Sequence, residues 1–126
     1  MRSRYGPQRR LQSAAQFDAV FKRGARLGGR LFLVVFAPNP FPFHRLGIAA
    51  SRRIGGAVAR NRARRLLRES FRRASRPAKG GFDVVVVAHR DLAACGQAEV
   101  DSELSERIRR IERSAGRIGA PAAPAG

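Results

Sequence analysis

Residues 51–76 have the sequence Ser51-Arg-Arg-Ile-Gly-Gly-Ala-Val-Ala-Arg-Asn-Arg-Ala-Arg-Arg-Leu-Leu-Arg-Glu-Ser-Phe-Arg-Arg-Ala-Ser-Arg76, with ten arginines and one acid, Glu69. The apolar residues of this stretch recur at three- and four-residue steps, the period of one helix face: Ala59, Ala63, Leu66, Leu67 and Phe71. The pattern predicts a helix from about Ala57 to about Arg73. Its apolar face should pack on a core.

The arginines of this helix gather opposite the apolar face. At 100° per residue, Arg64, Arg68 and Arg72 form one line, Asn61 and Arg65 lie beside it, and Arg60 and Arg62 lie at its borders. Like charges one turn apart repel each other by a few tenths of a kcal/mol. A face that only contacts solvent would carry interleaved acids. We therefore expect an anionic partner.

Composition limits the class of protein. The chain has 126 residues, 44% of them hydrophobic, and a net charge of +17, which indicates one folded basic domain that binds nucleic acid. No stretch approaches the roughly 20 apolar residues of a membrane span, and no helix carries the large apolar anchors of a membrane-surface protein. We therefore expect no membrane partner. Cys95 is the only cysteine, so we expect no internal disulfide and a reducing, cytoplasmic setting.

Three regions are expected along the chain. Residues 1–10 predict a mobile basic arm. Residues 11–113 predict a single α-β RNA-binding domain. Residues 114–126 end in an Ala/Pro/Gly-rich run without periodicity, which predicts a disordered tail.

Within the domain, Ser13 offers a cap for a short helix that stops at Gly24 and places Phe17 and Phe21 on one face. Those two rings are either core packing or a stacking surface for unpaired bases. Apolar runs predict strands at 31–37, 44–50 and 82–88, the first two forming an antiparallel hairpin with a wide loop. A final helix is expected from Val100 to Arg113.

The sequence offers no set of catalytic side chains. His44 and His89 have no second ligand at metal-binding spacing, and Asp83 and Asp91 have no partner acid for general acid-base chemistry. We expect no catalytic residue and no metal held by a protein motif. A DNA-reading helix would carry several Asn, Gln, Ser or Thr side chains for base edges. Asn61 alone has that role here, so no DNA partner is expected. A DNA-binding module stays open as an alternative, and it predicts preference for a duplex with a defined half-site.

Several of these residues together form a recognisable signature. The signature consists of Arg45-Leu-Gly-Ile, followed by Ser51-Arg-Arg-Ile-Gly-Gly-Ala-Val-Ala-Arg-Asn-Arg-Ala-Arg-Arg-Leu-Leu-Arg-Glu-Ser-Phe-Arg72. It resembles the sequence signature of the bacterial ribonuclease P protein subunit. The early helix with its two phenylalanines and the strand at 82–88 followed by Arg90 extend the similarity over roughly residues 9–113. The resemblance implies an α+β fold. This is a two-layer α-β sandwich of about four strands with a basic crossover helix, similar to the second domain of a small-subunit ribosomal protein, with a short fourth strand near residues 23–30.

The resemblance also implies a function. In that family the RNA is the catalyst, holds the Mg²⁺ ions and removes the 5′ leader of precursor tRNA. Ribonuclease P RNA and precursor tRNA are thus the expected partners. By motif, the RNA-binding residues would be Arg60, Asn61, Arg62, Arg64, Arg65, Arg68 and Arg72. The cleft for the leader would be formed by Phe17, Phe21, Ser51, Arg52, Arg53 and Arg90.

The alternative is a structural ribosomal RNA-binding protein without a catalytic role. It would use the same basic helix but would have no need of an open face at Phe17 and Phe21.

Overall fold

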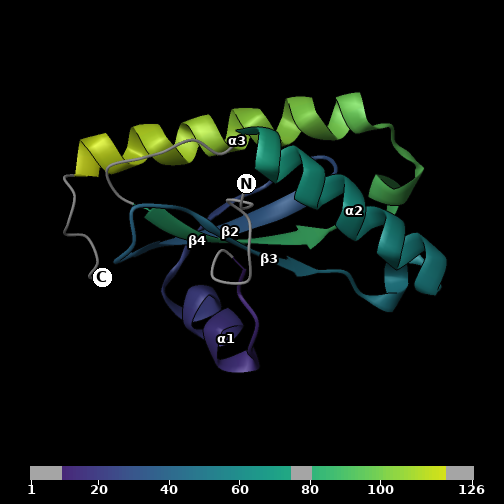
Figure 1. The fold of residues 1–126 in the computed structure, drawn as a ribbon, viewed down its shortest axis with the longest axis horizontal. Coiled ribbons are helices and arrows are strands. Elements are labelled where there is room, and N and C mark those ends of the chain that lie inside the picture. Colours follow the sequence, from purple (N-terminus) through teal and green to yellow (C-terminus); the bar gives the residue numbers. More distant parts are fainter. Residues whose placement is uncertain (1–9, 75–80, 119–126) are drawn as a thin grey trace, which may run out of the picture.

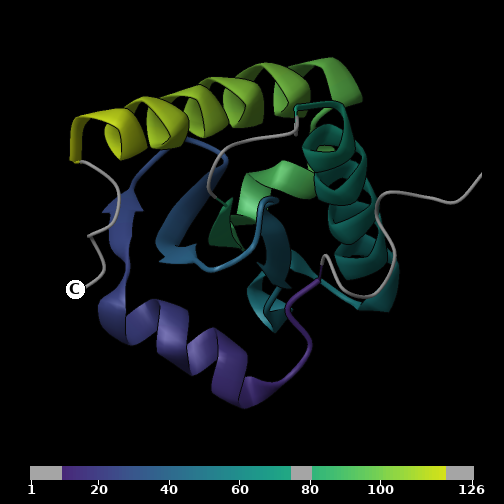
Figure 2. The same cartoon turned by 60° about the vertical axis from the view of Figure 1, so that its left-hand side comes forward.

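The computed structural model describes residues 10–74 and 81–118. Its elements, in chain order, are α1 (Ala14–Arg23), β1 (Ala25–Leu27), β2 (Phe32–Asn39), β3 (Arg45–Ala49), the 3₁₀-helix η2 (Arg52–Ile54), α2 (Ala57–Ala74), β4 (Gly81–Ala88), the 3₁₀-helix η3 (Arg90–Ala94) and α3 (Gln97–Ile118). The expected α+β class is confirmed. A four-stranded sheet has α2 and α3 on one face and α1 on the other (Figures 1 and 2).

The predicted hairpin of residues 31–37 and 44–50 is wrong. The strand order is β1-β2-β4-β3, so β4 lies between the two; β2 pairs with β4 antiparallel, and β3 pairs with β4 parallel. The valine run of β4 is buried on both sides of the sheet, which favours a central place. A parallel neighbour needs a crossover connection, and α2 provides it between β3 and β4.

The fourth strand implied near residues 23–30 is present as β1. It pairs antiparallel with β2, from Ala25 opposite Phe36 to Leu27 opposite Val34. β2 also runs two residues beyond its expected end at Ala37, through Pro38. The pairing of β1 with β2 ends at Phe36. Pro38 has no partner on β1, so the missing N–H of Pro38 disturbs no pairing between these two strands.

The helices begin and end where local chemistry places them. Ser13 caps α1: its Oγ accepts the Gln16 N–H at 3.1 Å, and the Gln16 side chain accepts the Ser13 N–H, also at 3.1 Å. α2 agrees with the predicted helix. α3, by contrast, begins at Gln97 and continues to Ile118, so the predicted boundary at residue 114 is too early. Residues 119–126 of the expected tail lie outside the described part of the chain.

The main core lies between the sheet and the pair α2 and α3. Alternate residues of β2 and β4 point into it, together with the apolar faces of the two helices, and its fully buried members include Phe32, Val34, Leu67, Val84, Val86, Leu104 and Ile111. A second, smaller cluster on the opposite face consists of Leu11, Val20, Val35 and Val85. The sheet is therefore closed on one side and only partly covered on the other.

Candidate nucleic-acid interface

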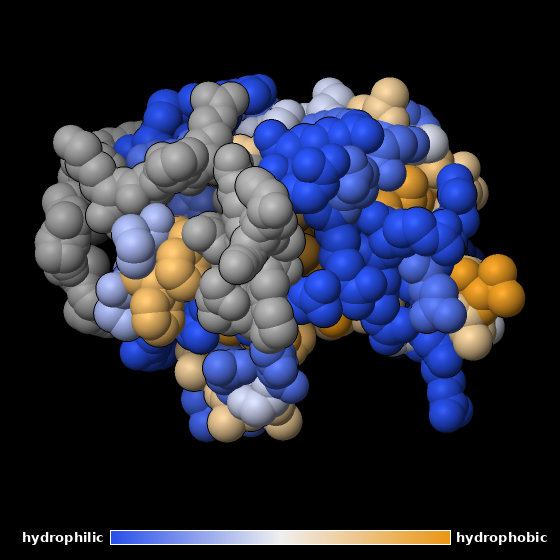
Figure 3. Space-filling view, viewed as in Figure 1, coloured by the Kyte–Doolittle hydropathy of each residue, from blue (hydrophilic) through white to orange (hydrophobic). Residues whose placement is uncertain are grey.

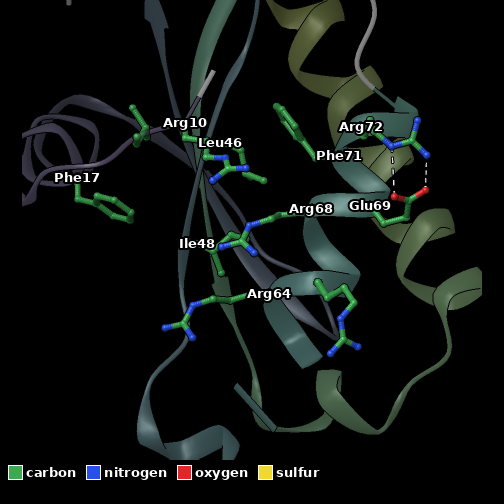
Figure 4. Close-up of a pocket in the computed structure, with 11 residues that line it drawn as sticks. Arg10, Phe17, Leu46, Ile48, Arg64, Arg68, Glu69, Phe71 and Arg72 are labelled. Carbon is green, nitrogen blue, oxygen red and sulfur yellow. Dashed lines mark hydrogen bonds and ion pairs between the residues drawn. The ribbon is translucent and has the colours of Figure 1, made fainter. Parts of the chain in front are cut away.

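A groove runs between α2 on one side and α1 with its preceding residues on the other, over β3. We call it the α2 groove. Its apolar floor is formed by Leu11, Phe17, Leu46, Ile48 and Phe71. Its charged rim is formed by Arg10, Arg64, Arg65, Arg68, Glu69 and Arg72. Arg64 and Arg68 extend from α2 toward the side on which Phe17 lies (Figure 4). In the space-filling view, hydrophilic residues form the surface over α2 (Figure 3).

Phe17 reaches this groove because β3 carries a glycine beneath it. A Cβ atom at Gly47 would lie 2.8 Å from the Phe17 ring, so a larger residue there would displace the ring. The capping box that starts α1 holds the helix in place, and Phe17 packs half-buried against the smaller apolar cluster. One part of the Phe17 ring is thus supported by the sheet while the groove borders the rest.

Arg10 is a rim residue that the sequence analysis missed. It was assigned to a mobile arm at residues 1–10, yet it forms a parallel β-bridge with Leu46, and the Leu11 N–H donates to the Leu46 carbonyl at 2.9 Å. Leu11 is buried and anchors this segment. A signal was present in the sequence, because Leu11 is an apolar residue directly after the basic run. Residues 1–9 lie outside the described part of the chain.

The rim carries uncompensated positive charge. Partial burial lowers the pKa of Arg68 below its ordinary value, and the nearby charges of Arg10 and Arg64 lower it further. Within the described residues, no acid forms an ion pair with Arg10, Arg64, Arg65 or Arg68. Glu69 pairs with Arg72 and with Arg73. An anion entering the groove would relieve this repulsion.

The three residues of the Arg-Asn-Arg motif form hydrogen bonds within the protein. Arg60 donates to the Gly55 carbonyl at 3.2 Å, and the Asn61 amide oxygen accepts from Arg64 at 3.3 Å. Arg62 donates from two nitrogens to backbone carbonyls at the C-terminal end of η3. None of the three lines the α2 groove, whereas the later residues Arg64, Arg65, Arg68 and Arg72 do.

The residues expected in the leader cleft occupy two places. Phe17 lines the α2 groove, and Phe21 lies half-buried on the face of the sheet that α1 covers only in part, which we call the open face. The polar members are exposed at the other place: Ser51, Arg52 and Arg53 at η2, and Arg90 at the start of η3. η2 and η3 contact each other because they follow the carboxyl ends of the neighbouring parallel strands β3 and β4. The Ser51 hydroxyl accepts the Arg53 N–H at 3.2 Å.

The groups with possible reactive chemistry have structural partners. His44 is buried, its Nδ1 accepts the Phe82 N–H at 3.0 Å, and its Nε2 lies 3.1 Å from a Glu112 oxygen. Asp83 receives two bonds from Arg45, each at 2.8 Å. Burial raises the pKa of the Cys95 thiol. Among the described residues, no group of three or more His, Cys, Asp or Glu side chains could hold a metal ion, and no helix has the length and hydropathy to cross a membrane.

Known proteins share both this sequence pattern and this fold. The family model for ribonuclease P matches residues 6–112. The ribonuclease P protein component of Desulfovibrio desulfuricans is 38% identical over 110 residues, covering 84% of this chain and 85% of the relative. That of Geobacillus kaustophilus is 33% identical over 102 residues, covering 80% and 84%.

Among solved structures, the ribonuclease P protein of Thermotoga maritima superimposes with a TM-score of 0.72 at 34% identity, covering 82% of this chain and 97% of that one. Residues 6–112, which the family model matches, contain the basic helix, the four-stranded sheet and the α2 groove. The chain therefore belongs to the family of bacterial ribonuclease P protein subunits.

Proposed function

We propose that this protein binds ribonuclease P RNA through the arginines of α2 and receives the single-stranded 5′ leader of precursor tRNA at the open face of the sheet. The observation that carries the proposal is the α2 groove. It combines the Phe17 ring with an arginine rim in which Arg64, Arg65 and Arg68 have no acid partner among residues 10–74 and 81–118.

The two sides of the groove suit two parts of a nucleotide. An aromatic ring accepts any base by stacking, because every base has a flat π-face. Guanidinium groups follow the phosphate backbone without reading its sequence. A site of this kind can therefore accept single strands of different sequence.

In this proposal the RNA carries out the cleavage. Mg²⁺ ions held mainly by the RNA would activate the water that attacks the phosphodiester, and the protein would supply affinity and orientation. The tight internal bonding of His44 and Asp83 leaves these side chains engaged in the fold. A reducing, cytoplasmic setting, inferred from the single buried cysteine, is part of the same proposal.

Cleavage of a precursor tRNA by a bacterial ribonuclease P RNA at low magnesium, with and without the protein, tests the proposal. We expect the protein to restore cleavage, and the protein alone to cleave nothing. If the protein binds RNA but leaves the rate unchanged with its cognate RNA as well, the alternative of a purely structural RNA-binding protein replaces this proposal. The family match already disfavours that alternative.

A further inference from the structure

Arg62 has an internal role that its place in the basic motif does not suggest. Its Nε donates to the Ala93 carbonyl at 2.7 Å, and its Nη2 donates to the Cys95 carbonyl at 2.9 Å. One edge of the planar guanidinium thus binds two backbone oxygens. A guanidinium presents its donors in a fixed fork that an ammonium group cannot reproduce.

The two carbonyls lie at the C-terminal end of η3, where helical carbonyls lack partners of their own. η3 is only five residues long, and Leu92 anchors it by packing fully buried in the main core. Arg62 holds the end of the same short helix against α2. Arg90 is the first residue of η3. A contact that fixes η3 therefore also fixes the backbone position from which the Arg90 side chain extends.

We infer that Arg62 is a positioning residue. It fastens η3 to α2 and thereby sets the position of Arg90 for the leader, and it does not neutralise a phosphate itself. The inference rests on the proposed function for the role of Arg90. It replaces the expectation, drawn from the motif, that Arg62 contacts RNA.

Arg65 provides a matched control three residues along the same helix. It is exposed, lines the α2 groove and forms no ion pair or side-chain hydrogen bond within the described residues. Substituting Arg65 therefore removes the same charge from the same helix without touching η3.

Hydrogen exchange in the free protein tests the attachment without any RNA. The amides to follow are those of Leu92 and Cys95, which donate to the His89 and Leu92 carbonyls at the start and the end of η3. Loss of charge-assisted hydrogen bonds in Arg62→Gln should speed exchange at both amides by about tenfold or more. Arg65→Gln should leave both rates unchanged. Equal rates in the two variants would overturn the inference.

The holoenzyme tests the link to the leader. We compare affinity for precursor and mature tRNA in Arg62→Lys, which keeps the charge but loses the fork, in Arg90→Ala and in the double variant. Arg62→Lys should lose preference for the precursor by about as large a factor as Arg90→Ala, and the double variant should lose no more than Arg90→Ala. Losses that multiply in the double variant would show independent contacts and overturn the inference.

The salt dependence of binding to ribonuclease P RNA separates positioning from phosphate contact. Arg65→Gln should reduce the log-log slope by about 1, while Arg62→Gln should leave it unchanged. An equal reduction in both variants would make Arg62 a phosphate contact. If Arg90→Ala itself leaves leader affinity unchanged, the leader role of Arg90 fails and the functional half of this inference fails with it. Hydrogen exchange still decides whether Arg62 holds η3.

Discussion

The two faces of the sheet differ in how fully the side chains of β2 and β4 are covered. On the face under α2 and α3, Val34 and Val86 are fully buried in a cluster that contains most of the apolar core. On the other face, their neighbours Val35 and Val85 belong to a cluster of four buried residues, partly covered by α1. Leu33 and Val87 at the edge of that cluster stay only half-buried. We call these the closed face and the open face.

The difference shows where stability and binding reside. Burial contributes about 25 cal/mol per Å² of apolar surface, so the closed face provides most of the stability. The open face leaves apolar surface beside a row of arginines, which adds little to stability and matches the chemistry of an unpaired nucleotide. A protein of this size can leave one face open because two long helices close the other.

The largest expected effect lies on the closed face. Leu67 is completely buried, so Leu67→Ala should lower the free energy of unfolding by about 2–5 kcal/mol. Val58→Ala is the control on the same helix, because Val58 is 84% exposed and its truncation should change little. Urea unfolding of both variants measures the difference. A Leu67→Ala loss below about 1 kcal/mol would contradict the division into closed and open faces.

On the open face, affinity should change more than stability. Phe17→Ala should weaken binding of the single-stranded leader by about 1–3 kcal/mol if a base stacks on the ring. Phe21→Ala is the matched variant, since Phe21 packs against the same cluster but does not line the α2 groove. Affinity for precursor tRNA, compared with mature tRNA, measures both. Equal losses of affinity in the two variants, accompanied by equal losses in the free energy of unfolding, would assign the rings to packing.

Arg10 tests whether the rim extends across the groove from α2. Arg10→Gln should weaken RNA binding and reduce the log-log salt slope by about 1. Arg26→Gln removes the same charge from an exposed position on β1 outside the groove and should leave the slope nearly unchanged. Similar slopes in both variants would show that net charge, and not position, governs the contribution of Arg10.

The smallest effect concerns the contact between α2 and α3. Burial alone would raise the pKa of Asp101, but hydrogen bonds from Ser70, Gln97 and Arg73 outweigh it and the pKa is lowered. A carboxyl whose pKa is lower in the folded state stabilises the fold above its unfolded pKa, near 4. This contribution is lost as pH falls through the folded value.

Asp101→Asn should therefore cost about 1 kcal/mol or less at neutral pH, and the cost should shrink as the pH falls below about 4. Urea unfolding of wild type and variant between neutral and acid pH measures it. A cost that stays constant over this range would show that the ionised carboxylate is not the stabilising form.

Local patterns in the sequence predicted most elements. The cap at Ser13, the glycine at Gly24 and the periodicity of α2 placed two helices to within one residue, because capping and amphipathic spacing act over a few residues. The end of α3 was placed too early because Ser114, Ala115 and Gly116 interrupt the run of large apolar residues before Ile118. The neighbours of β3 were wrong because strand pairing joins residues distant in the chain, and periodicity carries no information about the partner.

The sequence by itself determined that this chain is a basic, mixed α+β domain of the ribonuclease P protein family with an arginine face on one helix. Only the tertiary structure decided which arginines share a groove. Arg10 joins the rim through a β-bridge with Leu46, whereas Arg62 donates to the carbonyls at the C-terminal end of η3. Charge, periodicity and motif spacing are properties of neighbours along the chain. The direction of a long side chain depends on which backbone groups the fold brings within its reach.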